Sequence, residues 1–252
     1  MQDMCLAAIR RGIPEIAFTE HADFMEEDEC RGRLDPDEWW VELDRCRSSF
    51  QGRLIIRAGL EFGEPHRFPR EFDNLANAYP WDVILGALHW VDDTLVFDAR
   101  YFERSPDRAY QAYFDELAEL AGGPSFDVLA HLDIVKRYGY DHYGPFDPRP
   151  YEKSIRRVLR LCADRGTSLE INTATTRRPV GEPSPELKIL EWFREEGGTW
   201  ITLGSDAHEP DHVGYELNRA FRLAGRAGFE NLARWEARRA TAASLAKGSG
   251  FR

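Results

Sequence analysis

Short runs rich in valine, isoleucine and leucine alternate along this chain with longer segments of helical periodicity. The short runs predict six strands, at residues 15–19, 54–62, 83–88, 127–130, 168–172 and 200–204. Parallel strands need long crossover connections, and a helix is the usual one. The alternation therefore predicts an α/β protein with a parallel sheet built from βα units.

Helix boundaries are marked by proline and glycine. The pairs Asp35-Pro36, Ser105-Pro106 and Ser184-Pro185 each predict a helix start, and glycines at 52, 122–123, 166 and 197–198 predict helix ends. Connections from helix to strand are short, whereas the connections that leave the strands are long. Because such loops build the site of an α/β barrel, we expect the site at the strand carboxyl ends. The sequence shows no internal repeat, low-complexity tract or interdomain linker, so we expect one domain, residues 1–252.

The charge and composition exclude several classes of protein. The 252 residues carry 44 acidic and 33 basic side chains, a net charge of −11, so no broad basic field attracts nucleic acid or anionic lipid. No run approaches the ~18–20 apolar residues of a membrane span, and the N-terminus lacks the apolar core of a signal peptide. The four cysteines form no CxxC motif and indicate no disulfide framework. We expect a cytoplasmic protein with neither a nucleic-acid nor a membrane partner.

Four of the seven histidines lie at or just beyond the ends of predicted strands: His21, His89, His131 and His208. Four carboxylates accompany them: Glu20, Glu61, Asp133 and Asp206. Imidazole nitrogens and carboxylate oxygens are ligands for Zn, Mn or Fe. The pattern therefore predicts a metal centre at this face, whereas His66, His142 and His212 lie within loops and are not expected to be ligands.

Several segments resemble motifs of the polymerase and histidinol phosphatase (PHP) family of metallophosphoesterases. They are Ile16-Ala-Phe-Thr-Glu-His21-Ala-Asp, Gly59-Leu-Glu61, Ile84-Leu-Gly-Ala-Leu-His89-Trp-Val-Asp, Leu129-Ala-His131-Leu-Asp-Ile-Val-Lys-Arg, Glu170-Ile-Asn-Thr and Gly204-Ser-Asp206-Ala-His208. The segments around His89 and His131 look most like the histidinol-phosphate phosphatase branch. The resemblance implies a distorted (β/α)7 TIM-like barrel that holds up to three divalent metal ions.

The resemblance also implies metal ligands, residue by residue. Glu61 looks like the carboxylate that bridges two metal ions, and His89 and His131 complete one of those two sites. The other implied ligands are Asp206 at the first metal and His21 and His208 at the third, and the expected catalytic residues are Glu61, Asp206 and His208.

The sequence departs from the family pattern at its start. The family begins with an HxH motif at the end of its first strand, but this sequence has no histidine before His21 and opens with a helical segment, residues 4–11. The barrel is therefore expected to lack its first strand, which would leave two unpaired edges in a parallel sheet. Either the given start omits a strand and HxH, or the protein has lost two of its three metal sites.

The function that the resemblance implies is hydrolysis of L-histidinol phosphate to L-histidinol and phosphate, a step of histidine biosynthesis. A basic side chain is expected on the substrate phosphate, with Arg177 first and Lys136 or Arg137 second, because a guanidinium group binds phosphate through two hydrogen bonds. Three alternatives remain open: a phosphatase for another small phosphoester, an amide hydrolase on a similar barrel, and a degenerate barrel kept for protein interaction.

Overall fold

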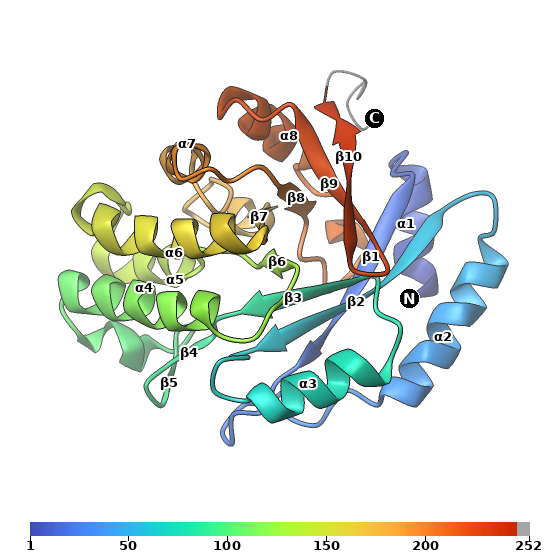
Figure 1. Ribbon diagram of the computed structural model, residues 1–252, viewed down its shortest axis with the longest axis horizontal. Helices are drawn as coiled ribbons and strands as arrows, with labels where there is room; N and C mark the ends of the chain where they lie inside the picture. Colours follow the sequence, from blue (N-terminus) through green and yellow to red (C-terminus); the bar gives the residue numbers. More distant parts are fainter. Residues whose placement is uncertain (246–252) are drawn as a thin grey trace.

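The computed structural model describes residues 1–245, and its centre is a curled sheet of six parallel strands (Figure 1). In spatial order the strands are β1 (Glu15–Ala22), β2 (Ile55–Gly63), β3 (Val83–Ala87), β6 (Val128–Leu129), β7 (Ser168–Asn172) and β8 (Ile201–Gly204). Each neighbouring pair is parallel. The predicted α/β class and all six predicted strands are confirmed, and the sheet is a half-barrel.

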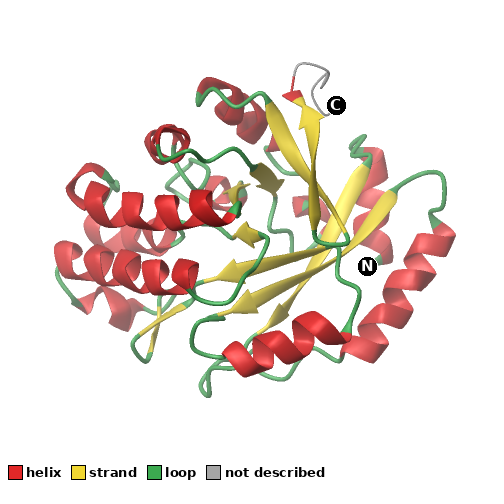
Figure 2. Cartoon of the chain, viewed as in Figure 1, coloured by secondary structure: helices red, strands yellow, loops and turns green. Residues whose placement is uncertain are grey.

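Helices pack around the outside of the curled sheet (Figure 2). They are α1 (Gln2–Arg10), α2 (Pro36–Ser49), α3 (Pro69–Ala78), α4 (Pro106–Gly122), α5 (Val135–Tyr143), α6 (Glu152–Arg165), α7 (Leu187–Glu195) and α8 (Leu217–Arg226), with 3-10 turns η1 (Ala99–Glu103), η2 (Arg149–Tyr151), η3 (Ala174–Arg177) and η4 (Pro210–His212). None of the described helices is long and apolar enough to cross a membrane.

Two of the three predicted helix starts are correct. Asp35 caps α2 by accepting hydrogen bonds from two backbone N–H groups of the first turn, and α4 begins at Pro106. The third prediction is wrong, because α7 begins only at Leu187, beyond the Ser184-Pro185 pair. The backbone of Ser184 instead exchanges hydrogen bonds with Asn172 at the end of β7, which holds this segment extended.

Both faces of the central strands are buried, as a parallel sheet requires. In β3, Ile84 contributes to the main core, while Val83, Leu85 and Ala87 point to the opposite side and form a second cluster inside the half-barrel. This alternation follows from the two-residue period of a strand. The partly buried Trp235 packs against this second cluster.

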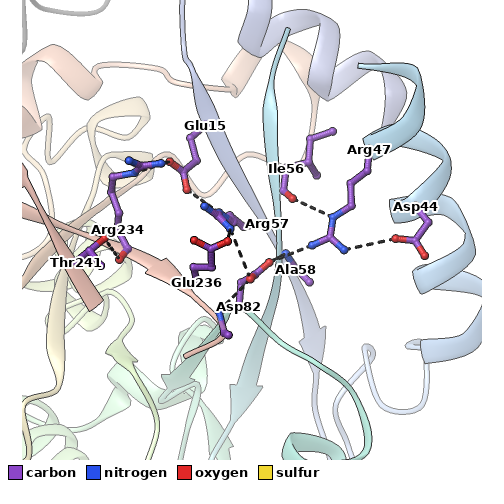
Figure 3. Close-up of polar contacts among 11 residues, drawn as sticks. Glu15, Asp44, Arg47, Ile56, Arg57, Ala58, Asp82, Arg234, Glu236 and Thr241 are labelled. Carbon is purple, nitrogen blue, oxygen red and sulfur yellow. Dashed lines mark hydrogen bonds and ion pairs between the residues drawn. The ribbon is translucent and has the colours of Figure 1, made fainter. Parts of the chain in front are cut away.

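Trp235 belongs to a C-terminal hairpin that the sequence pattern did not predict, formed by β9 (Asn231–Glu236) and β10 (Arg239–Ser244). A smaller hairpin, β4 (Trp90–Val91) with β5 (Thr94–Leu95), follows β3. Ion pairs attach the C-terminal hairpin to the amino ends of the sheet strands (Figure 3). Arg57 of β2 lies 2.7 Å from Glu15 and 2.8 Å from Glu236, and Glu15 also binds Arg234.

The edges of the six-stranded sheet are β1 and β8. A cavity of about 850 Å³ lies between them, and residues of both strands line it together with residues of the hairpin. It extends from Glu61 and His21 near the carboxyl ends of the strands to Trp235 at the other end. Within residues 1–245 no strand precedes β1, so the cavity separates the two edges.

Asp82 joins the sheet, α2 and the hairpin, and its removal should destabilise the fold. Its carboxylate accepts hydrogen bonds from the buried N–H of Ala58, from Arg47 and from the backbone of Ala237. We expect Asp82→Ala to lower the free energy of unfolding by about 2–4 kcal/mol, because these donors lose their acceptor in a largely buried place. Urea denaturation measures the change.

Asp44→Ala is the matched control, because Asp44 pairs with the same Arg47 but its side chain is 69% exposed. Its expected effect is below about 0.5 kcal/mol, as for other exposed ion pairs. Equal losses in the two variants would contradict the importance of the buried contacts.

Candidate active site

The six predicted metal ligands lie together at one end of the sheet, where the carboxyl ends of the parallel strands meet. The ligands are His21 in β1, Glu61 in β2, His89 after β3, His131 after β6, and Asp206 and His208 after β8. The ring centroids of His21 and His89 lie 5.8 Å apart, those of His89 and His131 5.4 Å apart, and those of His21 and His208 5.7 Å apart. Five separate strands therefore contribute to one cluster.

Glu61 lies at the centre of this cluster and is buried. Its Oε1 atom is 2.9 Å from Nε2 of His131 and 3.4 Å from Nε2 of His89. Burial would raise the pKa of Glu61, but the positive charge on His21 and hydrogen bonds from the two other histidines hold it well below its ordinary value. Glu61, His89 and His131 are close enough together to hold one metal ion.

Asp23 was not among the predicted site residues, yet it contacts two of the histidines. Its Oδ2 atom lies 3.4 Å from Nδ1 of His21, and its Oδ1 atom lies 3.4 Å from Nδ1 of His89. Burial would raise the pKa of Asp23, but the contacts with both rings lower it to about 2. The sequence held a signal, since Asp23 follows His21 by two residues and so can share its side of an extended chain.

His208 is the exposed member of the cluster, and the half-buried Asp206 lies beside it. Nε2 of His208 lies 3.1 Å from Oδ1 of Asp206, as expected from their spacing of two residues. This hydrogen bond raises the pKa of His208. Asp206 itself is held at a positive φ of 45°, a conformation that non-glycine residues rarely adopt and that concentrates at functional sites.

Two buried carboxylates hold the backbone of the central histidines, and neither was predicted as a site residue. Glu64 accepts hydrogen bonds from the N–H groups of His89, at 2.6 Å, and Trp90, at 3.0 Å. Glu170 accepts one from the N–H of His131 at 3.0 Å. Burial raises the pKa of Glu64 to about 7 and that of Glu170 well above its ordinary value. Either protonation state leaves an oxygen that can accept these bonds.

Two predicted basic residues lie beside Asp206. Arg177 donates to the backbone oxygens of Ser205, at 2.8 Å, and Asp206, at 2.9 Å. Arg137 comes within 3.7 Å of the Asp206 carboxylate, and its buried Nε atom has no hydrogen-bond partner among the described residues. Because its Nε–H donor is unused, the guanidinium of Arg137 can bind an anionic substrate beside this cluster of histidines and carboxylates.

Lys136, the third predicted basic residue, is held by buried partners that are not among the predicted metal ligands. Its ammonium is buried and donates to Asp133 at 2.7 Å and to the backbone oxygen of Pro183 at 3.0 Å. Asp133 also accepts a hydrogen bond from Ser184. Of the three basic candidates, Lys136 is the one that the geometry supports least, because its donors already have buried partners.

The remaining histidines and the cysteines lie outside the cluster. His66 contacts Glu116, His212 contacts Glu209, and His142 stacks on Phe102. The four cysteines carry free thiols. These contacts account for the three histidines outside the cluster, whereas Cys30 lies close to Asp23 and Asp28.

The donor set fits a divalent transition metal. His131 leaves a buried Nδ1 atom without a hydrogen-bond partner among the described residues, and Glu61 is met only by imidazoles. The charge of Glu61 raises the pKa of His21 to about 9. Burial lowers the pKa of His89, but Asp23 and Glu61 outweigh it and hold the pKa well above its ordinary value. Protonated histidines therefore balance the negative charge of the carboxylates in this cluster. A metal cation bound to the same imidazole nitrogens can replace these protons.

Comparisons with known proteins find relatives that match most of this chain. Residues 1–174 match the PHP domain model. A histidinol-phosphatase from Lactococcus lactis is 30% identical over 239 residues, covering 90% of this chain and 84% of that protein, and a probable histidinol-phosphatase from Deinococcus radiodurans is 30% identical over 219 residues, covering 84% and 81%.

A solved structure shows the same architecture. The crystal structure of histidinol phosphate phosphatase from Lactococcus lactis, complexed with zinc, L-histidinol and phosphate, superposes with a TM-score of 0.87 at 27% identity. The match covers 95% of this chain and 91% of that one. With the family model spanning residues 1–174, these likenesses show that the chain belongs to the PHP domain family.

Proposed function

We propose that this protein is a metal-dependent phosphomonoesterase of the cytoplasm that hydrolyses L-histidinol phosphate to L-histidinol and phosphate. The observation that carries the proposal is the buried Glu61 between His89 and His131, at the strand ends of a fold shared with the zinc-containing Lactococcus lactis phosphatase. The curated relatives with 30% identity are named for this activity. The substrate would be a small phosphorylated molecule.

The proposed metal ligands are His21, Glu61, His89, His131, Asp206 and His208, and among these Glu61, Asp206 and His208 are the proposed catalytic residues. Divalent ions bound there would activate an attacking water and neutralise the charge that grows on the phosphoryl oxygens. The chain's own contribution is to fix the donors. Burial of Glu61 excludes water from its carboxylate, and contacts with His208 and Arg137 hold the carboxylate of Asp206 beside the cluster.

The substrate phosphate would be bound by arginine. Arg177 and Arg137 approach Asp206 from different segments, η3 and α5, and so flank one side of the cluster. Backbone acceptors fix the orientation of the Arg177 guanidinium, whereas Arg137 keeps an unused Nε donor. Charge-assisted hydrogen bonds from such groups would orient the phosphoester toward the metal donors.

The proposed substrate is tested by comparing phosphoesters under identical conditions. The purified chain, supplied with zinc or manganese, should release phosphate from L-histidinol phosphate with a kcat/KM at least ~10-fold higher than from nucleotide or sugar monophosphates, a difference of about 1.4 kcal/mol. Colorimetric phosphate release measures the rates. A faster reaction with another phosphoester, or none with any of them, would argue against the proposal.

The metal ligands are tested by metal content. His89→Ala and Glu61→Ala should each abolish tightly bound zinc, because each removes one of three protein ligands from the most complete set. Elemental analysis after gel filtration gives the stoichiometry. His66→Ala, a histidine outside the cluster, is the control and should retain the metal content of the unmodified chain. Unchanged zinc in both ligand variants would refute the assignment.

The phosphate-binding role is tested at Arg177. Arg177→Ala should lower kcat/KM for the phosphoester by an amount equivalent to about 2–4 kcal/mol, through lost charge-assisted hydrogen bonds, with no change in metal content. Arg178→Ala removes the neighbouring, exposed arginine and should be close to neutral. If Arg177→Ala is neutral as well, the role falls to Arg137.

A further inference from the structure

Asp23 places one carboxylate between two histidines that come from different strands. It follows β1 directly, and its side chain is only 2% exposed. Oδ2 lies 3.4 Å from Nδ1 of His21, and Oδ1 lies 3.4 Å from Nδ1 of His89. These are ion-pair distances, and Oδ1 forms no hydrogen bond with the described residues, so this buried oxygen remains available to the imidazole beside it.

The nitrogen that each ring turns toward Asp23 decides which nitrogen remains for a metal. An ionised carboxylate only accepts hydrogen bonds, so an imidazole nitrogen that faces it must carry the proton. A neutral imidazole has one such proton, which leaves its other nitrogen with a free lone pair. In His89 that other nitrogen, Nε2, points to Glu61 at 3.4 Å. Asp23 thus lies on the side of the His89 ring opposite to Glu61.

Gly63 at the end of β2 makes room for this carboxylate. A Cβ atom at position 63 would lie 2.3 Å from Oδ1 of Asp23 and 3.7 Å from Nδ1 of His89. Real Cβ atoms do not approach an oxygen so closely, so any larger residue at position 63 would displace the Asp23 carboxylate. The lack of a side chain at Gly63 of β2 thus leaves the space in which Asp23 contacts His89.

We propose that Asp23 is a positioning residue that fixes both His21 and His89 with the proton on Nδ1, so that both rings present Nε2 to metal. The proposal rests on the metal centre of the proposed function and adds a residue that does not itself bind the ion. Carboxylates behind metal-bound histidines typically change metal affinity 10- to 100-fold when they are removed. Because the one carboxylate of Asp23 contacts both His21 and His89, the orientations of the two rings depend on each other.

The test uses the full chain with zinc alone as the probe. Asp23→Ala removes both acceptors, Asp23→Asn keeps one acceptor oxygen, and Gly63→Ala displaces the carboxylate without removing it. Asp127→Asn is the matched control, since Asp127 is also a buried aspartate but pairs with Arg238 near the amino end of β6. Competition with a chelator gives the zinc dissociation constant, and thermal unfolding shows which variants are folded.

We expect zinc binding to weaken by about 10- to 100-fold in Asp23→Ala, less in Asp23→Asn, and measurably in Gly63→Ala, with the control within about 2-fold of the unmodified chain. NMR of the zinc-loaded protein with ¹⁵N-labelled histidine supplies a readout that a merely structural role would not move. The unmodified chain should show protonated Nδ1 in both His21 and His89. Asp23→Asn should change one of these signals, and Asp23→Ala both.

Several results would overturn the proposal. If Nδ1 of either histidine carries the metal in the unmodified chain, Asp23 is not behind the ligands. If the folded Asp23 variants bind zinc as tightly as the unmodified chain with unaltered histidine signals, Asp23 has no positioning role. Should Asp23→Ala fail to fold, Asp23→Asn and Gly63→Ala decide the question. If the unmodified chain binds no zinc, the proposed metal centre fails together with this inference, whereas intact zinc binding in the Asp23 variants alone leaves that centre standing.

Discussion

The site depends on one buried negative charge, the carboxylate of Glu61. A buried carboxylate is costly unless opposite charge or hydrogen-bond donors meet it. His131 and His89 approach the same Oε1 atom from the next two strands of the sheet, at 2.9 and 3.4 Å. The need to neutralise Glu61 raises the pKa of His21 and makes the cluster a place for a cation. A parallel sheet makes this possible because all strand carboxyl ends meet at one face.

Two further buried carboxylates near Glu61 hold the backbone of the histidines that contact it. Glu64 and Glu170 accept the backbone N–H groups of His89 and His131, so the segments leaving β3 and β6 are held at the point where each histidine begins. Close packing supports this arrangement. A Cβ atom on Gly204 would fall 1.8 Å from the carboxylate of Glu170, so β8 can pass this side chain only as glycine. The proposed metal ligands are therefore positioned by backbone contacts as well as by their own side chains.

The opposite end of the sheet carries a separate set of charges whose effect is structural. Arg57, Glu15 and Asp82 attach the β9–β10 hairpin to the amino ends of the sheet strands (Figure 3). The hairpin places Trp235 against the apolar cluster that includes Leu85 and Val128. Its turn has positive φ at Ala237 and Arg238, and their N–H groups donate to Asp82. Stability at one end and chemistry at the other are thus carried by different residues of the same strands.

The sequence by itself determined the six parallel strands and the gathering of His21, Glu61, His89, His131, Asp206 and His208, because strand periodicity and strand ends are local signals. Only the tertiary structure decided the features that depend on contacts between residues far apart in the sequence. The Ala237–Arg238 turn lacks the glycine that would reveal it and exists because Asp82 binds it, and Ser184-Pro185 is extended because Asn172 pairs with Ser184. Lys136 is buried against Asp133, and Asp23 faces two histidines from separate strands. No local pattern encodes such contacts, since each is fixed by the position of another strand.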